Sequence, residues 1–81
     1  MINKNLLKAK IVERGFTQTQ VRKIMGLADN TFSFKVNGKK EFFNDEIQQL
    51  QQILKLSNDE LLSIFYPNEE EGSATENEQG R

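Results

Sequence analysis

The sequence has no cysteine and no histidine. Without cysteine the chain forms no disulfide, thiolate metal site or cysteine nucleophile, which is consistent with a reducing cytoplasm. Without histidine it lacks the commonest general base and the commonest metal ligand. Only scattered carboxylates and hydroxyls remain for chemistry, so we expect a protein that is not an enzyme and uses no cofactor or metal.

Long apolar runs are missing as well. The stretch MINKNLLKAKIVERG carries charges at positions 4, 8, 10, 13 and 14, which fits neither a signal peptide nor a membrane span. We therefore expect a soluble, cytoplasmic protein. A chain of 81 residues makes one small domain with a modest core, which dimerisation would help to stabilise.

Charge is unevenly distributed, although the net charge is only −1. Residues 1–40 carry nine basic and two acidic side chains, a net +7, whereas residues 41–66 and 67–81 each have a net charge of −4. The first half therefore predicts a basic patch of the kind that binds nucleic acid. Residues 67–81 are acidic and have no large apolar side chain, which predicts a disordered tail. Such a tail either solubilises the chain or mimics phosphates and competes for the basic patch.

Apolar residues recur at helical spacing in residues 2–66, which predicts one all-α domain of five short helices over residues 1–66. Gly15 is expected to stop the first helix in the left-handed C′ position, and Gly26 to end the second helix with a tight turn. T-x-x-Q from Thr17 and S-x-x-E from Ser57 predict capping boxes. The core residues expected on the first three helices are Leu6, Leu7, Ile11, Val21, Ile24, Met25, Leu27, Ala28, Phe32 and Val36.

Leu27 and Ala28 are expected to lead from the Gly26 turn into a third helix of about eight residues, which closes at Asn37-Gly38. Asn44 is expected to cap the fourth helix, and Pro67 to stop the fifth. Two short helices joined by a glycine turn are the outline of a helix-turn-helix, whose second helix lies in the major groove of DNA. The fit is physical, because a helix about 10–12 Å across matches a groove about 12 Å wide.

These parts resemble the phage Cro/repressor-like (Xre-type) helix-turn-helix regulators, most closely the short Cro-type proteins of Gram-positive phages and prophages. The resemblance covers about Leu6 to Phe65 through GFTQ (15–18), the Gly26 turn, NTFS (30–33), NGK (37–39) and LKLSNDELL (54–62). It implies a compact lambda-repressor-like bundle and a homodimeric repressor of double-stranded operator DNA. The alternatives are an antirepressor, which binds a partner repressor protein, and an antitoxin.

The resemblance also implies which residues bind DNA. Gln18, at the start of the second helix, is expected to bind a phosphate. Base contacts are expected from the third helix, and backbone contacts from the loop after it. The residues of these two groups are Asp29, Asn30, Ser33 and Phe34, followed by Asn37, Lys39 and Lys40.

Each of these positions has alternatives. Asn30 pairs with adenine or is simply solvent-exposed, and the two lysines contact phosphates or are only solvated. Phe34 lies about 200° around the helix from Phe32, so it faces outward. There it packs on a thymine methyl or serves a protein partner. Asp29 repels phosphates, but it can accept from cytosine N4, cap the third helix, or do both.

The chain departs from the family at two positions. The family usually has a small residue where Arg22 stands and an apolar one where Lys35 stands. Both side chains are expected to lay their stems along the core edge and keep their charges in water. A two-fold dimer would hold its recognition helices about 34 Å apart. The candidate dimer residues, unless they only cover the core of the monomer, are Leu62, Phe65 and Tyr66.

Overall fold

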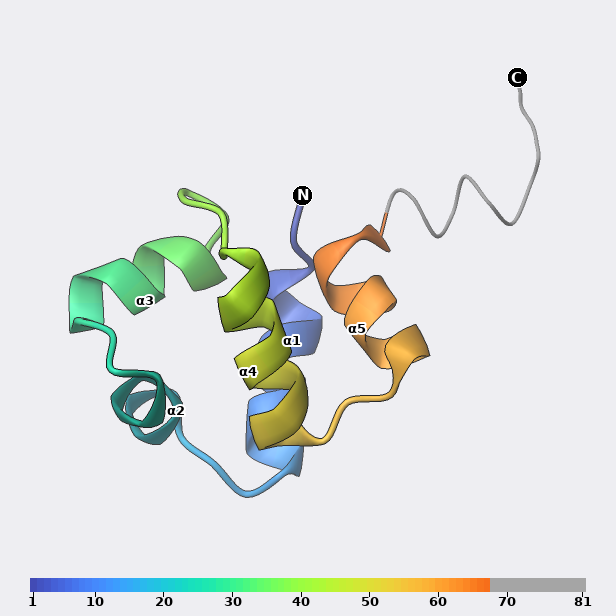
Figure 1. The fold of residues 1–81 in the computed structure, drawn as a ribbon, viewed down its shortest axis with the longest axis horizontal. Helices are drawn as coiled ribbons and strands as arrows, with labels where there is room; N and C mark the ends of the chain where they lie inside the picture. The colour runs from blue at the N-terminus through green and yellow to red at the C-terminus, as the bar shows by residue number, and fades with distance from the viewer. Residues whose placement is uncertain (68–81) are drawn as a thin grey trace.

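The computed structural model describes residues 1–67 of the 81-residue chain. The helices are α1 (Lys4–Glu13), α2 (Gln18–Met25), α3 (Asp29–Val36), α4 (Asn44–Leu54) and α5 (Asn58–Phe65). Residues 1–67 contain no strand, which confirms the all-α prediction with five helices. In Figure 1, α2 and α3 lie at one end of the bundle and α5 at the other, with α1 and α4 between them. The acidic tail expected after this bundle lies, from residue 68 on, outside the described residues.

Local side-chain chemistry sets the helix ends. Thr17 Oγ accepts from the Gln20 N–H at 3.1 Å, while Gln20 Oε1 accepts from the Thr17 N–H at 2.9 Å. Ser57 and Glu60 make the same reciprocal pair at 3.1 and 2.8 Å. Gly26 ends α2 with a φ of +75°, a conformation that costs other residues a Cβ clash. Both capping boxes and the glycine stop are therefore confirmed.

The core lies between all five helices. Three phenylalanine rings in successive contact run through it and connect two of the helices. Phe42, in the α3–α4 connection, meets Phe32 edge-on at 6.3 Å between centroids and Phe65 at 5.8 Å. Such edge-to-face pairs add about 0.5–1.5 kcal/mol each beyond the burial of their area. Phe42 therefore links α3 to α5. The buried apolar residues are Leu7, Ile11, Val21, Phe32, Val36, Phe42, Ile47, Leu50, Leu54, Leu56, Ile64 and Phe65.

Three local predictions are wrong. Ile24 is 58% exposed rather than in the core, and Val21 is the buried residue of α2 instead. Ala28 is exposed, because it is the extended residue that precedes α3. Asn44 is the first residue of α4 and not its cap; Phe43 holds that place, and its N–H donates to Glu46 Oε1 at 2.8 Å.

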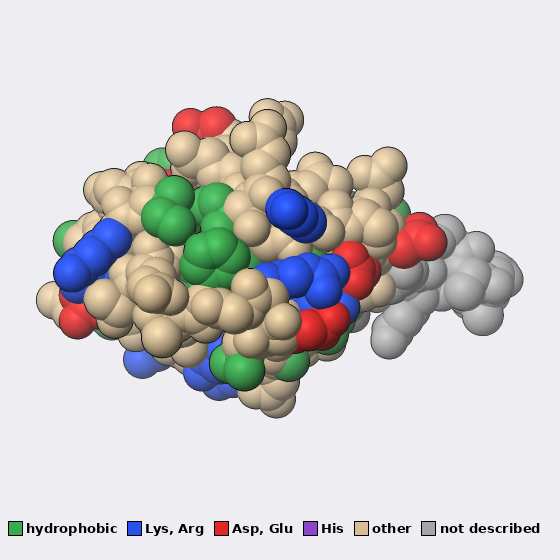
Figure 2. Space-filling view, turned by 90° about the horizontal axis from the view of Figure 1, so that it is seen from below, with side chains coloured by type: hydrophobic (Ala, Val, Ile, Leu, Met, Phe, Trp, Pro, Cys, Tyr) green, Lys and Arg blue, Asp and Glu red, His purple; other side chains and the backbone are tan. Residues whose placement is uncertain are grey.

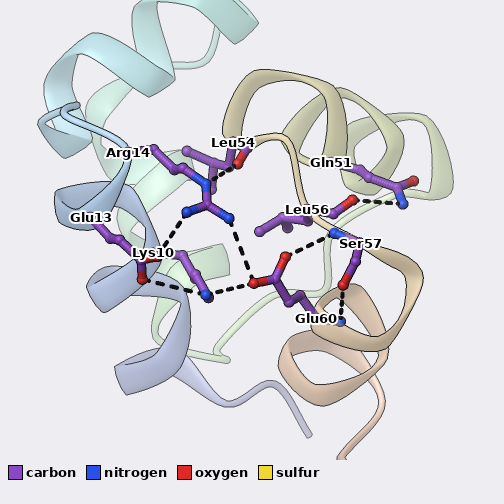
Figure 3. A network of polar contacts seen from close by, with 8 residues as sticks. All are labelled: Lys10, Glu13, Arg14, Gln51, Leu54, Leu56, Ser57 and Glu60. Atoms are coloured by element: carbon purple, nitrogen blue, oxygen red, sulfur yellow. Dashed lines mark hydrogen bonds and ion pairs between the residues drawn. The ribbon is translucent and has the colours of Figure 1, made fainter.

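A cluster of charged side chains joins α1 to α5 (Figure 3). Lys10 Nζ lies 2.7 Å from Glu60 Oε2, and Arg14 Nη2 lies 3.6 Å from the same oxygen. Arg14 also donates through Nε to the Leu54 carbonyl at 2.7 Å, at the end of α4. Two cations of the N-terminal half are thus committed to holding the bundle together.

Candidate nucleic-acid interface

The turn between α2 and α3 is built from backbone hydrogen bonds. The Gly26 N–H donates to the Lys23 carbonyl at 3.1 Å, and the Leu27 N–H donates to the Arg22 carbonyl at 3.0 Å. These bonds satisfy two carbonyls at the end of α2 and let the chain reverse within residues 26–28. The two helices pack against each other. This arrangement leaves one side of α3 uncovered.

The uncovered side of α3 carries the predicted base-reading residues. Phe32 and Val36 are buried, so the opposite side of the helix faces solvent. At about 100° per residue, the four predicted residues fall within an arc of roughly 140°. Phe34 is 43% exposed. The exposed residues of this arc are Asp29, Asn30, Ser33 and Phe34.

The loop after α3 folds back on the last turn of that helix. The Lys39 and Lys40 N–H groups both donate to the Phe34 carbonyl, at 2.8 and 3.2 Å. Asn37 Nδ2 donates to the Ser33 carbonyl at 2.9 Å. The exposed loop residues therefore continue the exposed arc of the helix. We call the whole set the α3 surface: Asp29, Asn30, Ser33, Phe34, Asn37, Lys39 and Lys40.

Gln18 lies on the neighbouring helix. It is exposed and is the first residue of α2, where backbone N–H groups lack partners within the helix. Of the eight predicted DNA-binding residues, seven are thus gathered on one surface and the eighth lies at the start of the adjoining helix.

The basic patch is smaller than the sequence predicts. Four of the nine cations in residues 1–40 are held in ion pairs, namely Lys10, Arg14, Arg22 and Lys35. Within residues 1–67, no ion pair holds Lys4, Lys8, Lys23, Lys39 or Lys40. Figure 2 shows basic and acidic side chains lying next to each other on one face of the molecule. Pairing of opposite charges, which sequence position does not reveal, leaves five of these nine cations outside the ion pairs of residues 1–67.

Lys35 does not extend its charge into water, contrary to expectation. Its side chain is 5% exposed, and Nζ lies 2.6 Å from Glu46 Oε1 on α4. The ammonium also lies 4.1 Å from the centre of the Phe43 ring, a cation–π contact. The lysine stays buried because the carboxylate and the ring replace its hydration. It ties the last turn of α3 to the start of α4.

Arg22 also departs from the expected arrangement. Its Nη1 donates to the Leu27 carbonyl at 3.4 Å, and its Nε lies 3.5 Å from Asp29 Oδ1. The side chain is 23% exposed, and its Nε is buried. Asp29 makes no capping hydrogen bond, so the capping alternative is wrong; Ala28 is the residue that precedes α3. Arg22 and Asp29, the acid on the α3 surface, are therefore partners.

The dimer candidates differ in how much surface they offer. Leu62 is 39% exposed and Tyr66 is partly buried. Phe65 lies in the core against Phe42, which leaves it little area for a partner. A second apolar feature was not predicted: a shallow hollow of about 370 Å³ where Phe16 and the exposed Ile24 meet. Figure 2 shows apolar side chains gathered in the middle of the face seen there.

Neither a metal cluster nor a membrane span is found in residues 1–67. No group of three or more acidic, histidine or cysteine side chains in this range is placed to hold a metal ion. None of the helices described is both long enough and apolar enough to cross a membrane.

Comparison with protein families matches residues 3–69 to a family described as "Protein of unknown function (DUF739)". The match spans most of the chain. A search of curated proteins found no match, and neither did a search of solved structures.

Proposed function

The chain belongs to this DUF739 family, and we propose that it is a Cro-type transcriptional regulator of a phage or prophage, which binds operator DNA through α3. The single observation that carries the proposal is the α3 surface. On the exposed side of α3 it presents amide, hydroxyl and aromatic side chains. The loop that follows adds two exposed lysines. This combination suits a helix in the major groove with basic groups on the flanking phosphates.

Each residue has a role that its chemistry supports. The carboxamide of Asn30 can pair with the N6 and N7 atoms of adenine, and Phe34 can pack on a thymine methyl. Gln18, at the positive end of α2, suits a phosphate. Lys39 and Lys40 supply charge that is not committed to an ion pair within residues 1–67. Repression then needs no chemistry, because an occupied promoter blocks polymerase.

We propose a homodimer as the binding species. A two-fold dimer would place two copies of α3 about 34 Å apart, which matches one turn of DNA and calls for a pseudo-palindromic operator. Leu62, which is exposed, and Tyr66, which is partly buried, offer the accessible part of the candidate dimer surface at the end of α5. A second copy would cover apolar area that a chain of this size can use for stability.

The test is a titration of the full-length protein against the DNA that flanks its own gene. We expect specific binding that weakens steeply as salt rises, because bound lysines release counterions from DNA. Asn30→Ala should lose discrimination by about 1–3 kcal/mol, the usual value of a bidentate base contact. Phe34→Ala should weaken binding only where a thymine faces it. Fluorescence anisotropy at several salt concentrations measures both effects.

Asn5→Ala is the matched control, because Asn5 is also an exposed helical asparagine but lies on α1. The affinity of Asn5→Ala for the DNA should equal that of the unaltered protein. Absence of any specific binding at about 50 mM salt, where phosphate contacts are strong, would contradict the proposal.

Three observations favour a second function, that of an antirepressor which binds a partner repressor. Phe34 is exposed, Ile24 on α2 and Phe16 just before that helix line a shallow hollow, and four cations are held in ion pairs. Exposed apolar groups of this kind suit a protein partner. This function would be favoured over repression if the unaltered protein binds no DNA but co-purifies with another regulator. Phe34→Ala should then abolish the co-purification.

A further inference from the structure

An ion pair crosses the turn between the two helices of the candidate interface. Arg22 on α2 and Asp29 on α3 approach to 3.5 Å between Nε and Oδ1. A second contact, from Arg22 Nη1 to the Leu27 carbonyl at 3.4 Å, ties the same guanidinium to the turn itself. One side chain therefore touches the turn and the first residue of α3. A shift of α3 relative to α2 would disturb the contact with Asp29.

The burial of the two partners is very unequal. The Arg22 side chain is 23% exposed, whereas the Asp29 side chain is 84% exposed. Arg22 Nε is buried and makes no hydrogen bond within residues 1–67. A buried N–H without a partner is costly, so it attracts the one carboxylate beside it. Arg22 therefore limits where the Asp29 carboxylate lies, although that carboxylate is almost fully in solvent.

The pair also explains how an acid is tolerated on a surface that is proposed to meet DNA. An isolated carboxylate there would repel phosphates. The Arg22 guanidinium, always charged, offsets that repulsion at close range. Since an ionised carboxylate has about four acceptor sites, the contact with Nε leaves most of them free to face outward. Asp29 makes no capping bond that would use them.

We propose that Asp29 determines specificity for cytosine and that Arg22 is the residue that positions it; this rests on the proposed function. An ionised carboxylate only accepts hydrogen bonds. In the major groove, guanine presents two acceptors and thymine presents its O4 acceptor, while adenine places the N7 acceptor beside its amino group. Cytosine presents the N4 amino donor alone. The carboxylate therefore selects cytosine, and Arg22 sets the point from which it does so.

The experiment is selection from a random DNA pool with the full-length protein and with three variants. The unaltered protein should enrich one cytosine in each half-site. The asparagine of Asp29→Asn can both donate and accept hydrogen bonds. The cytosine position of the half-site should therefore change to adenine, or its preference for cytosine should fall at least fivefold, while the other DNA positions stay unchanged. Arg22→Met keeps an apolar stem but removes the guanidinium. It should weaken the same cytosine preference, and Arg22→Lys should restore part of it.

The control is Asp59→Asn, which alters an exposed aspartate in the first turn of α5 and should leave every preference unchanged. Circular dichroism of each variant verifies that it is folded.

If the unaltered protein enriches no sequence, the proposed function fails and this inference fails with it. If it enriches a site that Asp29→Asn leaves intact, only the role of Asp29 is overturned. If Asp29→Asn changes one base but Arg22→Met does not, the positioning role of Arg22 is overturned.

Discussion

Glu60 is the single residue on which the charged cluster between α1 and α5 depends. Its Oε2 faces Lys10 Nζ at 2.7 Å and Arg14 Nη2 at 3.6 Å, and its Oε1 accepts from the Ser57 N–H at 2.8 Å. The hydrogen bond from Lys10, and then the one from the Ser57 backbone, lower the pKa of Glu60 from 4.5 to about 2. The ionised form is therefore favoured in the folded state.

Glu60→Gln should destabilise the protein at neutral pH and matter less in acid. A folded-state pKa below the unfolded value means that the stabilisation is fully present above about pH 4.5 and is lost as the pH falls toward 2. Glutamine still accepts from the Ser57 N–H, so the variant removes the charge and keeps the cap. Urea unfolding midpoints of both proteins between pH 7 and pH 2 measure the difference.

Glu41→Gln provides the comparison, because Glu41 is exposed and makes no ion pair within the described range. Its midpoint should stay close to that of the unaltered protein at every pH. A gap between the unaltered protein and Glu60→Gln that stays constant from pH 7 to pH 2 would count against the ion pair as the cause.

At the scale of elements, the buried pair of Lys35 and Glu46 joins α3 to α4. Glu46 Oε1 accepts from Lys35 Nζ at 2.6 Å and from the Phe43 N–H at 2.8 Å. The same carboxylate thus accepts from the backbone at the start of α4 and from a side chain in the last turn of α3. The loop that carries Lys39 and Lys40 runs between these two points, so its ends are fixed.

Lys35→Met should destabilise the fold by about 3–5 kcal/mol, because it leaves a buried carboxylate without its partner. The double variant Lys35→Met with Glu46→Gln should recover most of that loss, since glutamine is neutral and still accepts from the Phe43 N–H. Urea unfolding measures both. Lys39→Met, on the exposed loop, should change stability by less than about 0.5 kcal/mol. A double variant no more stable than Lys35→Met would refute the buried-charge explanation.

Interactions within a few residues could be predicted from the sequence, and those between helices could not. Thr17 with Gln20 and Ser57 with Glu60 are three apart, so their capping boxes are visible in the residue pattern. Lys35 and Glu46 are eleven residues apart on different helices, and no periodicity relates them. The exposed arc of α3 could be predicted from the inward position of Phe32. The contact between Arg22 and Asp29 could not, because it depends on the angle between two helices.

The same distinction explains the errors in the predicted core. Ile24 fits the apolar stripe of α2, but Val21 is the one buried side chain of that helix. Whether Ile24 is covered depends on which neighbour lies beside α2, which is a property of the assembled bundle. Asn44 is a good capping residue by type, yet Glu46 reaches the Phe43 N–H and moves the start of α4 by one residue.

At the scale of the whole molecule, the net charge does not describe where the cations outside the ion pairs of residues 1–67 lie. The net charge is −1, and ion pairs use four of the cations in the N-terminal half. Two of the cations outside those pairs, Lys39 and Lys40, belong to the α3 surface, whereas Lys4 and Lys8 lie on α1. If DNA is held by local contacts, the location of a charge should matter more than its contribution to the total.

Two double variants with equal charge separate these effects. Lys39→Gln with Lys40→Gln should lower the slope of log affinity against log salt by about 0.9 for each phosphate that is no longer neutralised, or about 1.8 per chain, and should weaken binding to all sequences alike. Lys4→Gln with Lys8→Gln removes the same charge from α1 and should leave the slope nearly unchanged. Titrations at four salt concentrations give both slopes. Equal reductions would mean that the total charge, and not contact by the α3 surface, attracts the DNA.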